Sequence, residues 1–292
     1  MADISYGSLG KWGRMGNQMF QYAGTKGIAA RNSLTFTIPP HPHWVYELHT
    51  AFKLTNLKPE QISHHINSYR FNIPQFHYHR GHVEQLRRPG QIYDHYDEGV
   101  DISGSYLQSY KYFETIEDEI KEDFEFKDNI INHVKKGIEG LNNPFFMHVR
   151  RGDYAKIQNH HPLLPVSYYE NALKLFPEDS DCILLTDNTA WCKEELIRTL
   201  YMKYPNRRIH IPTINKEHKG VGDIRNHKSA DGVQIDFIKM TATYDMALMT
   251  ICNGGIIANS TMSWWGAYLQ KDRTQNICTI SNDSTITYSH QC

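Results

Sequence analysis

A short charged segment near the middle of the chain has the residue types of an anion-binding site. Residues 148–154, HVRRGDY, follow an apolar run (residues 145–147) that is suited to a buried strand. A His, two Arg, a Gly and an Asp thus fall within six residues, where a strand would end and a loop would begin. Open α/β sheets bind their ligands at such strand ends. Arg150 and Arg151 can offer paired N–H donors to a diphosphate, so this segment is the leading candidate site.

Two more predicted strands end in polar clusters. Asp187 follows the strand expected at residues 182–185, and it can accept a hydrogen bond from a nucleobase N–H or a ribose hydroxyl. At a probable helix start, residues 259–263 can offer hydroxyl and backbone donors to the same anion. The alternatives are a strand-end turn for Asp187 and simple helix capping for the serines. Because the carboxyl ends of parallel strands lie along one edge, we expect the three clusters to converge on one crevice. The residues taken from the last cluster are Asn259, Ser260, Thr261 and Ser263.

A glycine-rich segment near the N-terminus is the third feature of interest. Glycine occurs at every third position from Gly7 to Gly16, and a helical pattern begins near Asn17. A glycine loop before a helix presents free backbone N–H groups, which attract phosphate. The alternative is a permissive connection without a ligand, since the spacing matches neither known phosphate-loop pattern.

These clusters need a scaffold of alternating strands and helices. Apolar runs predict strands at residues 4–6, 34–38, 145–149, 182–185, 209–211, 256–258 and 276–281. Helical spacing predicts helices at residues 113–124, 131–138, 167–176, 196–201 and 237–251, the third opening with a capping box at Ser167. Residues 41–100 show no assignable pattern, and residues 215–231 indicate a loop. Repeated strand–helix units without hairpin signals imply an α/β fold with parallel, doubly wound sheets.

Composition limits the class of protein. A chain of 292 residues favours two domains, which we place at 1–140 and 141–292. Its 31 Lys and Arg against 32 Asp and Glu argue against a general nucleic-acid binder.

Apolar stretches are too short for a membrane span, so we expect a cytoplasmic protein, or one peripheral to a membrane. Five cysteines without a C-x-x-C pair indicate reduced thiols. The His pairs lack the partners of a zinc site, and no metal is predicted.

Taken together and in order, the motifs resemble those of the α-1,2-fucosyltransferase family, which comprises inverting, GDP-fucose-dependent enzymes (GT11). The HVRRGDY segment matches the family's HxRRGDY, which also occurs in α-1,6 and protein O-fucosyltransferases. Residues 258–267, ANSTMSWWGA, are similar to ANSTFSWWGA and point towards α-1,2 linkage. Further likenesses are residues 13–23 (GRMGNQMFQYA, against GGLGNQLFQYA), 106–113 (YLQSYKYF) and 185–188 (LTDN, where the family has Ser-Asp-Asp).

The resemblance implies a GT-B fold, with two Rossmann-like domains facing across a cleft: an acceptor-side N-terminal domain and a GDP-fucose-binding C-terminal domain. It implies transfer of L-fucose to the 2-hydroxyl of a terminal β-galactoside on a glycan, with inversion and without metal or another cofactor. Arg150 would neutralise the β-phosphate, and Asp153 would serve as the base or only hold a neighbouring group. Donor binding is assigned to Gly16, Asn17, Gln18, His148, Arg151, Asp187, Asn259, Ser260, Thr261 and Ser263.

Some alternatives remain open. Asn188 replaces a family Asp, and the strand at residues 276–281 is not followed by the family's Pro and Trp. A fucosyltransferase of another linkage or acceptor, or a non-catalytic GDP-sugar- or glycan-binding relative, would fit the same sequence. Asp179 and Asp181 spell a D-x-D metal signature. We interpret it as a surface turn because it precedes its strand and so lies away from the predicted crevice. The sequence leaves the oligomeric state undetermined.

Overall fold

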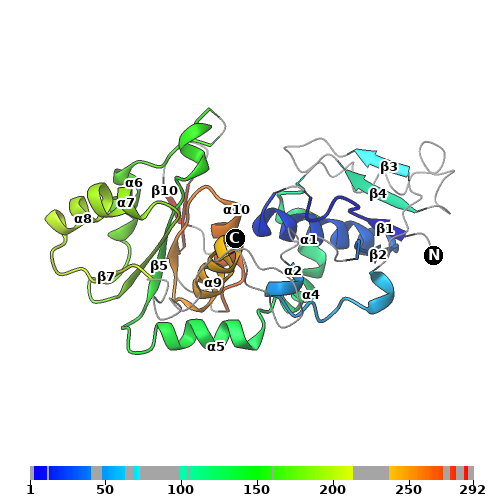
Figure 1. Ribbon diagram of the computed structural model, residues 1–292, viewed down its shortest axis with the longest axis horizontal. Coiled ribbons are helices and arrows are strands. Elements are labelled where there is room, and N and C mark those ends of the chain that lie inside the picture. Colours follow the sequence, from blue (N-terminus) through cyan, green and yellow to red (C-terminus); the bar gives the residue numbers. More distant parts are fainter. Residues whose placement is uncertain are drawn as a thin grey trace. The chain divides into compact units, whose positions relative to one another are not determined.

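The computed structural model describes residues 3–11, 13–40, 48–62, 69–72, 99–103, 106–159, 161–212, 237–271, 277–280 and 286–288. The chain divides into two compact units, Met1–Lys127 and Asp128–Cys292, and each has its own sheet (Figure 1). The unit boundary therefore lies before the position 140 that the sequence predicted. The reason is that helix α5 (Asp128–Gly137) packs on helix α9 (Phe237–Ile251) of the second unit, with the rings of His133 and Tyr244 4.8 Å apart.

The first unit is built on a parallel sheet of four strands in the order β2-β1-β4-β3. Its strands are β1 (Asp3–Ser5), β2 (Thr35–Thr37), β3 (Tyr69–Asn72) and β4 (Val100–Ser103). The strands expected at residues 4–6 and 34–38 are present. The sequence predicted neither β3 nor β4, because both lie within or directly after residues 41–100, where no regular alternation of apolar residues was found.

Helix α1 (Met15–Asn32) is the main helix of this unit, and it is followed by short helices. The single helix expected at 113–124 is instead divided into a 3₁₀ turn and a short α-helix. Its apolar residues Phe113, Ile120 and Phe124 are nevertheless buried as their spacing predicts. The short helices are α2 (Leu48–Ala51), η1 (Pro59–Gln61), η4 (Tyr110–Tyr112), η5 (Glu114–Ile116) and α4 (Glu117–Asp123).

A buried carboxylate ties α1 to α4. Asp123 is fully buried and accepts hydrogen bonds from the Tyr22 hydroxyl at 2.9 Å, the Lys26 ammonium at 2.6 Å and the Asn56 N–H at 2.8 Å. A buried charge is tolerated only with partners of this kind. This network belongs to the core of the first unit.

The second unit contains a sheet of six strands in the order β10-β9-β8-β5-β6-β7. Neighbouring strands are parallel, as predicted, except that β10 runs antiparallel to β9. The expectation of strands without hairpins is therefore wrong at this edge. The strands are β5 (Phe145–Val149), β6 (Cys182–Thr186), β7 (Ile209–His210), β8 (Gly255–Ile256), β9 (Ile277–Ile280) and β10 (Ile286–Tyr288).

Helices connect the parallel strands of this sheet. They are η6 (Asp153–Lys156), α6 (Val166–Leu173), α7 (Thr189–Trp191), the π-helical turn η7 (Cys192–Ile197), α8 (Arg198–Lys203), α9 (Phe237–Ile251) and α10 (Thr261–Tyr268). Helix α6 begins after Pro165 without a side-chain cap, so the predicted capping box at Ser167 is wrong. Phe145, Met147 and Val149 of β5 share a core with α6 and α8. The alternation of β5 therefore directs Phe146 and His148 to the opposite face.

Strand order identifies where this sheet can bind a ligand. β6 and β7 lie on one side of β5, whereas β8, β9 and β10 lie on the other. The order thus reverses between β5 and β8. In open parallel sheets a crevice forms at this point, outside the carboxyl ends of the strands.

Candidate active site

The clusters that follow β5, β6 and β8 meet at this edge of the second unit, as the sequence predicted. Nδ1 of His148 lies 2.5 Å from Oγ of Ser263 on α10, which joins the β5 cluster to the β8 cluster. Nη1 of Arg150 lies 2.8 Å from Oδ2 of Asp187, which joins the β5 cluster to the β6 cluster. Residues that are 115 positions apart in the first pair and 37 in the second are therefore direct partners.

The guanidinium of Arg150 is held between two carboxylates. Besides Asp187, Oδ1 of Asp153 accepts a hydrogen bond from Nη2 at 2.7 Å. The Arg150 side chain is 17% exposed, against 54% for Asp153 and 26% for Asp187. The fork of Arg150 is thus fixed in direction before any ligand arrives, and its more exposed partner is Asp153.

Asp187 orders the loop that follows β5. Its Oδ1 accepts the backbone N–H of Arg151 at 2.8 Å, while Oδ2 pairs with Arg150. A Cβ at Gly152 would lie 3.1 Å from Cγ of Asp187 and 2.5 Å from its Oδ2, so this close approach requires glycine. Both carboxylate oxygens therefore have partners within the protein. The predicted contact of Asp187 with a nucleobase or ribose stays a prediction.

Arg151 points to an aromatic partner. The guanidinium carbon of Arg151 lies 3.7 Å from the ring centroid of Trp191, a cation–π contact. Trp191 is in α7, which starts after Asn188, and the Asn188 side chain caps that helix by accepting the Trp191 N–H at 3.1 Å. The Asn that departs from the family pattern therefore has a capping role.

His148 is a buried, neutral imidazole. The residue is 4% exposed, and burial lowers its pKa to about 4. Of the nearby charges, that of Asp187 raises this pKa and that of Arg150 lowers it. Its hydrogen-bond partner Ser263 is fully buried and also accepts the N–H of Ala258 at 3.2 Å. At neutral pH this ring acts through one N–H and one lone pair, not through a positive charge.

The start of α10 supplies the third part of the site. Ser260 occupies the N-cap position, but its side chain forms no capping hydrogen bond, so the capping alternative does not describe it. Ser260 and Thr261 are half-buried at a helix end that presents backbone N–H groups. The adjacent Asn259 holds the loop after β5, because its carbonyl accepts from the Tyr154 hydroxyl at 3.2 Å and its amide donates to Pro162.

The glycine segment lies in the first unit. Helix α1 begins at Met15, two residues before the predicted Asn17, and Gly16 and Gln18 are buried within it. Asn17 is half-buried, and its Oδ1 accepts from the exposed Gln108 amide at 2.9 Å. Gln108 belongs to the YLQSYKYF motif and was not among the predicted site residues. The donor-binding roles of Gly16, Asn17 and Gln18 stay predictions.

Sequence reasoning also passed over Asp245. It is the only acidic residue of α9, and burial raises its pKa to about 7. α9 leads into β8, and a crossover helix runs antiparallel to the parallel strands that it connects, so we expect Asp245, six residues before the helix end, to lie ~9 Å further towards the carboxyl ends of the strands. The signal in the sequence was a single carboxylate in an otherwise apolar helical stripe.

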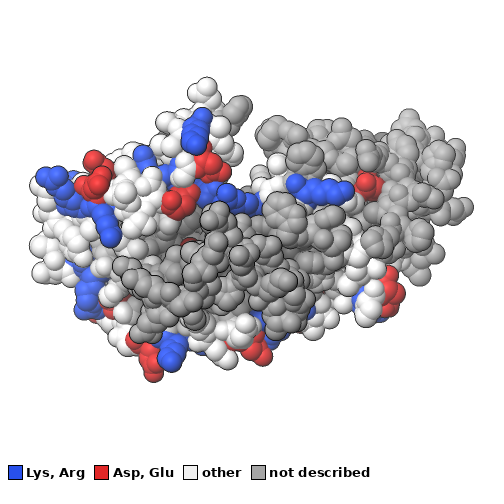
Figure 2. Space-filling model, in the orientation of Figure 1, with Lys and Arg blue, Asp and Glu red and all other residues white. Residues whose placement is uncertain are grey.

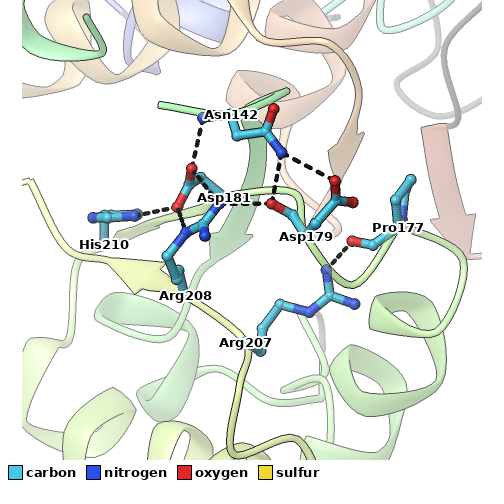
Figure 3. Close-up of polar contacts among 7 residues, drawn as sticks. All are labelled: Asn142, Pro177, Asp179, Asp181, Arg207, Arg208 and His210. Carbon is cyan, nitrogen blue, oxygen red and sulfur yellow. Dashed lines mark hydrogen bonds and ion pairs between the residues drawn. The ribbon is translucent and has the colours of Figure 1, made fainter. Parts of the chain in front are cut away.

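The D-x-D signature forms part of a structural network before the amino end of β6, whereas the candidate site lies at the carboxyl ends of the strands (Figure 3). Asp181 precedes β6 and accepts from Arg208 Nε at 2.6 Å, His210 Nε2 at 2.7 Å and the Asn142 N–H at 2.6 Å. The neighbouring Arg207 donates to the carbonyl of Pro177. The turn is confirmed, but its predicted place at the surface is wrong for Asp181, which is 3% exposed because its carboxylate has three hydrogen-bond donors. In the described ranges, no group of three or more His, Cys, Asp or Glu side chains is placed to hold a metal ion.

The described residues also bear on the expectations for the thiols, the surface charge and the membrane. Cys182, Cys192 and Cys252 are buried free thiols, as predicted. Basic and acidic side chains alternate over the described part of the face in Figure 2. Within the described segments, no helix is both long and apolar enough to cross a membrane.

Comparison with known proteins identifies the family. The family model for glycosyl transferase family 11 matches residues 8–204 and 222–290. The chain belongs to glycosyl transferase family 11. The resemblance drawn from the motifs is thereby confirmed, including the HVRRGDY and ANSTMSWWGA segments that lie within the matched residues.

Curated relatives of this family 11 chain are glycosyltransferases. The O-antigen biosynthesis glycosyltransferase WbnK of Escherichia coli is 27% identical over 56% of this chain and 49% of its own length. Galactoside alpha-(1,2)-fucosyltransferase 2 of gorilla is 27% identical over 88% of this chain and 67% of its own. An alpha-1,2-colitosyltransferase of Escherichia coli is 25% identical over 88% and 85%. The chain thus spans about half of the first relative.

Solved structures establish the GT-B fold. The NodZ alpha-1,6-fucosyltransferase from Bradyrhizobium, soaked with GDP-fucose, matches with a TM-score of 0.54 at 13% identity, over 99% of this chain and 98% of that one. A mutant of Arabidopsis thaliana FUT1 in complex with GDP matches with a TM-score of 0.55 at 12% identity, over 98% and 73%. The predicted α/β fold with parallel sheets is confirmed.

Proposed function

We propose that this protein transfers L-fucose from GDP-fucose to the 2-hydroxyl of a terminal β-galactoside, with inversion at the anomeric carbon. The observation that carries the proposal is the Arg150 fork, held by two carboxylates beside the start of α10 at the reversal of strand order. Such a constellation suits a nucleoside diphosphate leaving group. The gorilla relative supports the choice of α-1,2 linkage to galactoside.

In this mechanism Arg150 stabilises the charge that develops on the β-phosphate as the bond to fucose breaks. An incoming diphosphate competes with the carboxylates for the guanidinium, and Asp153 is displaced first because it is the more exposed partner. The released carboxylate is then the candidate base for the acceptor hydroxyl. Backbone N–H groups at the start of α10, with Ser260 and Thr261, bind the diphosphate from the other side of the crevice.

Guanine recognition is assigned to Asp245 in this proposal. A buried carboxylate is stabilised by paired N–H donors, and the edge of guanine offers two adjacent N–H groups. Asp187, for which a comparable role is predicted from the sequence, already has a partner on each oxygen. Arginines provide the positive charge that a metal ion would otherwise supply, so the reaction is proposed to be metal-independent.

A second candidate concerns the donor sugar. The colitosyltransferase covers most of both chains, so GDP-colitose is the alternative donor. Linkage to another hydroxyl, or GDP-sugar binding without transfer, are the remaining alternatives.

The decisive experiment incubates the protein with GDP-fucose or GDP-colitose and lactose or a lacto-series β-galactoside, with and without EDTA. We expect a product with fucose on the 2-hydroxyl of galactose, formed at an unchanged rate in EDTA. Transfer from GDP-colitose alone would make the protein a colitosyltransferase. GDP binding without product on any β-galactoside would overturn the proposed transfer in favour of a binding protein.

A further inference from the structure

The bond between His148 and Ser263 determines where the imidazole carries its proton. Oγ of Ser263 has two partners among the described residues, Nδ1 of His148 at 2.5 Å and the backbone N of Ala258 at 3.2 Å. The amide of Ala258 can only donate, so Oγ accepts from it. The hydroxyl hydrogen of Ser263 then needs an acceptor of its own.

Nδ1 of His148 is the acceptor that the described residues offer. Ser263 is fully buried, and a buried hydroxyl without an acceptor costs about 1–3 kcal/mol. If Nδ1 were protonated, Oγ would receive two donors and its own hydrogen would be left unpaired. Nδ1 therefore holds a lone pair, and because the ring is neutral at physiological pH, the hydrogen is on Nε2.

The ring edge that carries Nε2 belongs to the candidate site. His148 is next to last in β5, on the face away from the core formed by Phe145, Met147 and Val149. Its ring is close enough to Asp187 and Arg150 to feel both charges. The other ring nitrogen, Nδ1, forms its hydrogen bond with Ser263 of α10, the helix that follows β8, on the other side of the point where the strand order reverses.

We propose that Ser263 is a positioning residue that holds His148 in the tautomer protonated on Nε2, so that this N–H donates to an oxygen of the bound sugar nucleotide. The inference rests on the proposed function for its ligand, and the tautomer itself does not depend on it. The opposite tautomer would turn a lone pair towards the phosphate or ribose oxygens and repel them. Ser263 thus acts through His148, and its own hydroxyl does not touch the donor.

The tautomer is measured directly by a long-range ¹H–¹⁵N spectrum of protein labelled at histidine. The His148 signals are identified by their absence in His148→Gln. We expect Nε2 protonated and Nδ1 unprotonated in the unmodified protein, and a loss of this preference in Ser263→Ala. A protonated Nδ1 in the unmodified protein would overturn the proposal, whatever the activity.

Binding of GDP tests the consequence. Ser263→Ala is expected to raise the Kd for GDP by about 10-fold, the effect of one hydrogen bond. The matched control is Ser180→Ala, which removes another buried serine hydroxyl. Ser180 lies before the amino end of β6, away from the candidate site, so its substitution should leave the Kd for GDP unchanged. An unchanged Kd in Ser263→Ala would contradict the proposal.

Two amide substitutions locate the donating atom. The amide nitrogen of glutamine can reach the position of Nε2, whereas that of asparagine reaches only the position of Nδ1. His148→Gln should therefore bind GDP more tightly than His148→Asn, and the reverse order would count against the Nε2 donor. If the unmodified protein binds no GDP at all, the proposed function fails, while the spectrum still decides the tautomer.

Discussion

At the scale of the residue, Arg150 is the side chain on which the proposed chemistry depends most. Arg150→Ala should lower kcat by about 100- to 1000-fold, the cost of one well-placed donor to a developing anion. Arg150→Lys should not restore the rate, because an ammonium lacks the planar fork that can pair with Asp187 through one nitrogen and with the β-phosphate through the other. Asp153→Asn should lower kcat by about 100-fold or more if the carboxylate is the base.

Initial rates with GDP-fucose and a β-galactoside, together with circular dichroism of each variant, measure these effects. Arg198→Ala is the matched control, since Arg198 is exposed on α8, and its rate should equal that of the unmodified protein. A normal rate in Arg150→Ala would remove the Arg150 assignment. Retained turnover in Asp153→Asn would limit Asp153 to holding Arg150.

At the scale of the element, α1 packs so closely on η4 that glycine is required at the contact. A Cβ at Gly27 would overlap the carbonyl oxygen of Tyr112 and lie 2.7 Å from Cα of Phe113, and backbone cannot move aside cheaply. Gly27→Ala should lower the free energy of unfolding by about 1–3 kcal/mol despite the better helix propensity of alanine. Urea unfolding followed by circular dichroism gives the difference.

Gly137 in α5 is the comparison for that experiment. A Cβ there meets nothing within 4 Å, so Gly137→Ala should stabilise its helix by about 0.5–1 kcal/mol. Opposite signs at the two glycines are the expected result. Stabilisation by both substitutions would mean that α1 and η4 are not in close contact.

At the scale of the whole molecule, the Asp181 network makes the second unit sensitive to acid. Hydrogen bonds from Arg208, His210 and the Asn142 N–H hold the pKa of Asp181 well below its usual range. Its unfolded pKa is about 3.9, so the stabilisation is complete above about pH 5 and is lost as the pH falls towards the folded value. The loss should be on the order of 2 kcal/mol between pH 7 and pH 2.

The free energy of unfolding of Asp181→Asn, measured over the same pH range, isolates this contribution. The variant should be less stable at pH 7 and should lose less stability on acidification, so that the two curves converge at low pH. Glu139→Gln serves as the control, because Glu139 is exposed in the same unit and outside the network, and the curve of this variant should run parallel to that of the unmodified protein. Parallel curves for Asp181→Asn would assign the acid sensitivity to other carboxylates.

The local pattern of the sequence determined most elements of the second unit and the chemistry of its site. Apolar runs located β5, β6 and β7, and polar residues after β5, β6 and β8 marked the edge where the clusters meet. The order of the motifs indicated the family. These features are readable because the period of a strand or helix, and the chemistry of a side chain, are properties of neighbouring residues.

Only the tertiary structure decided which elements and side chains are partners. It placed β8 beside β5, which creates the reversal of strand order, and it joined α5 to the second unit through α9. It gave Arg150 two carboxylate partners, placed Ser263 against His148 and put the carboxyl of Asp245 where desolvation raises its pKa. The physical reason is that pairing and desolvation depend on residues distant in the chain, which no local pattern in the sequence records.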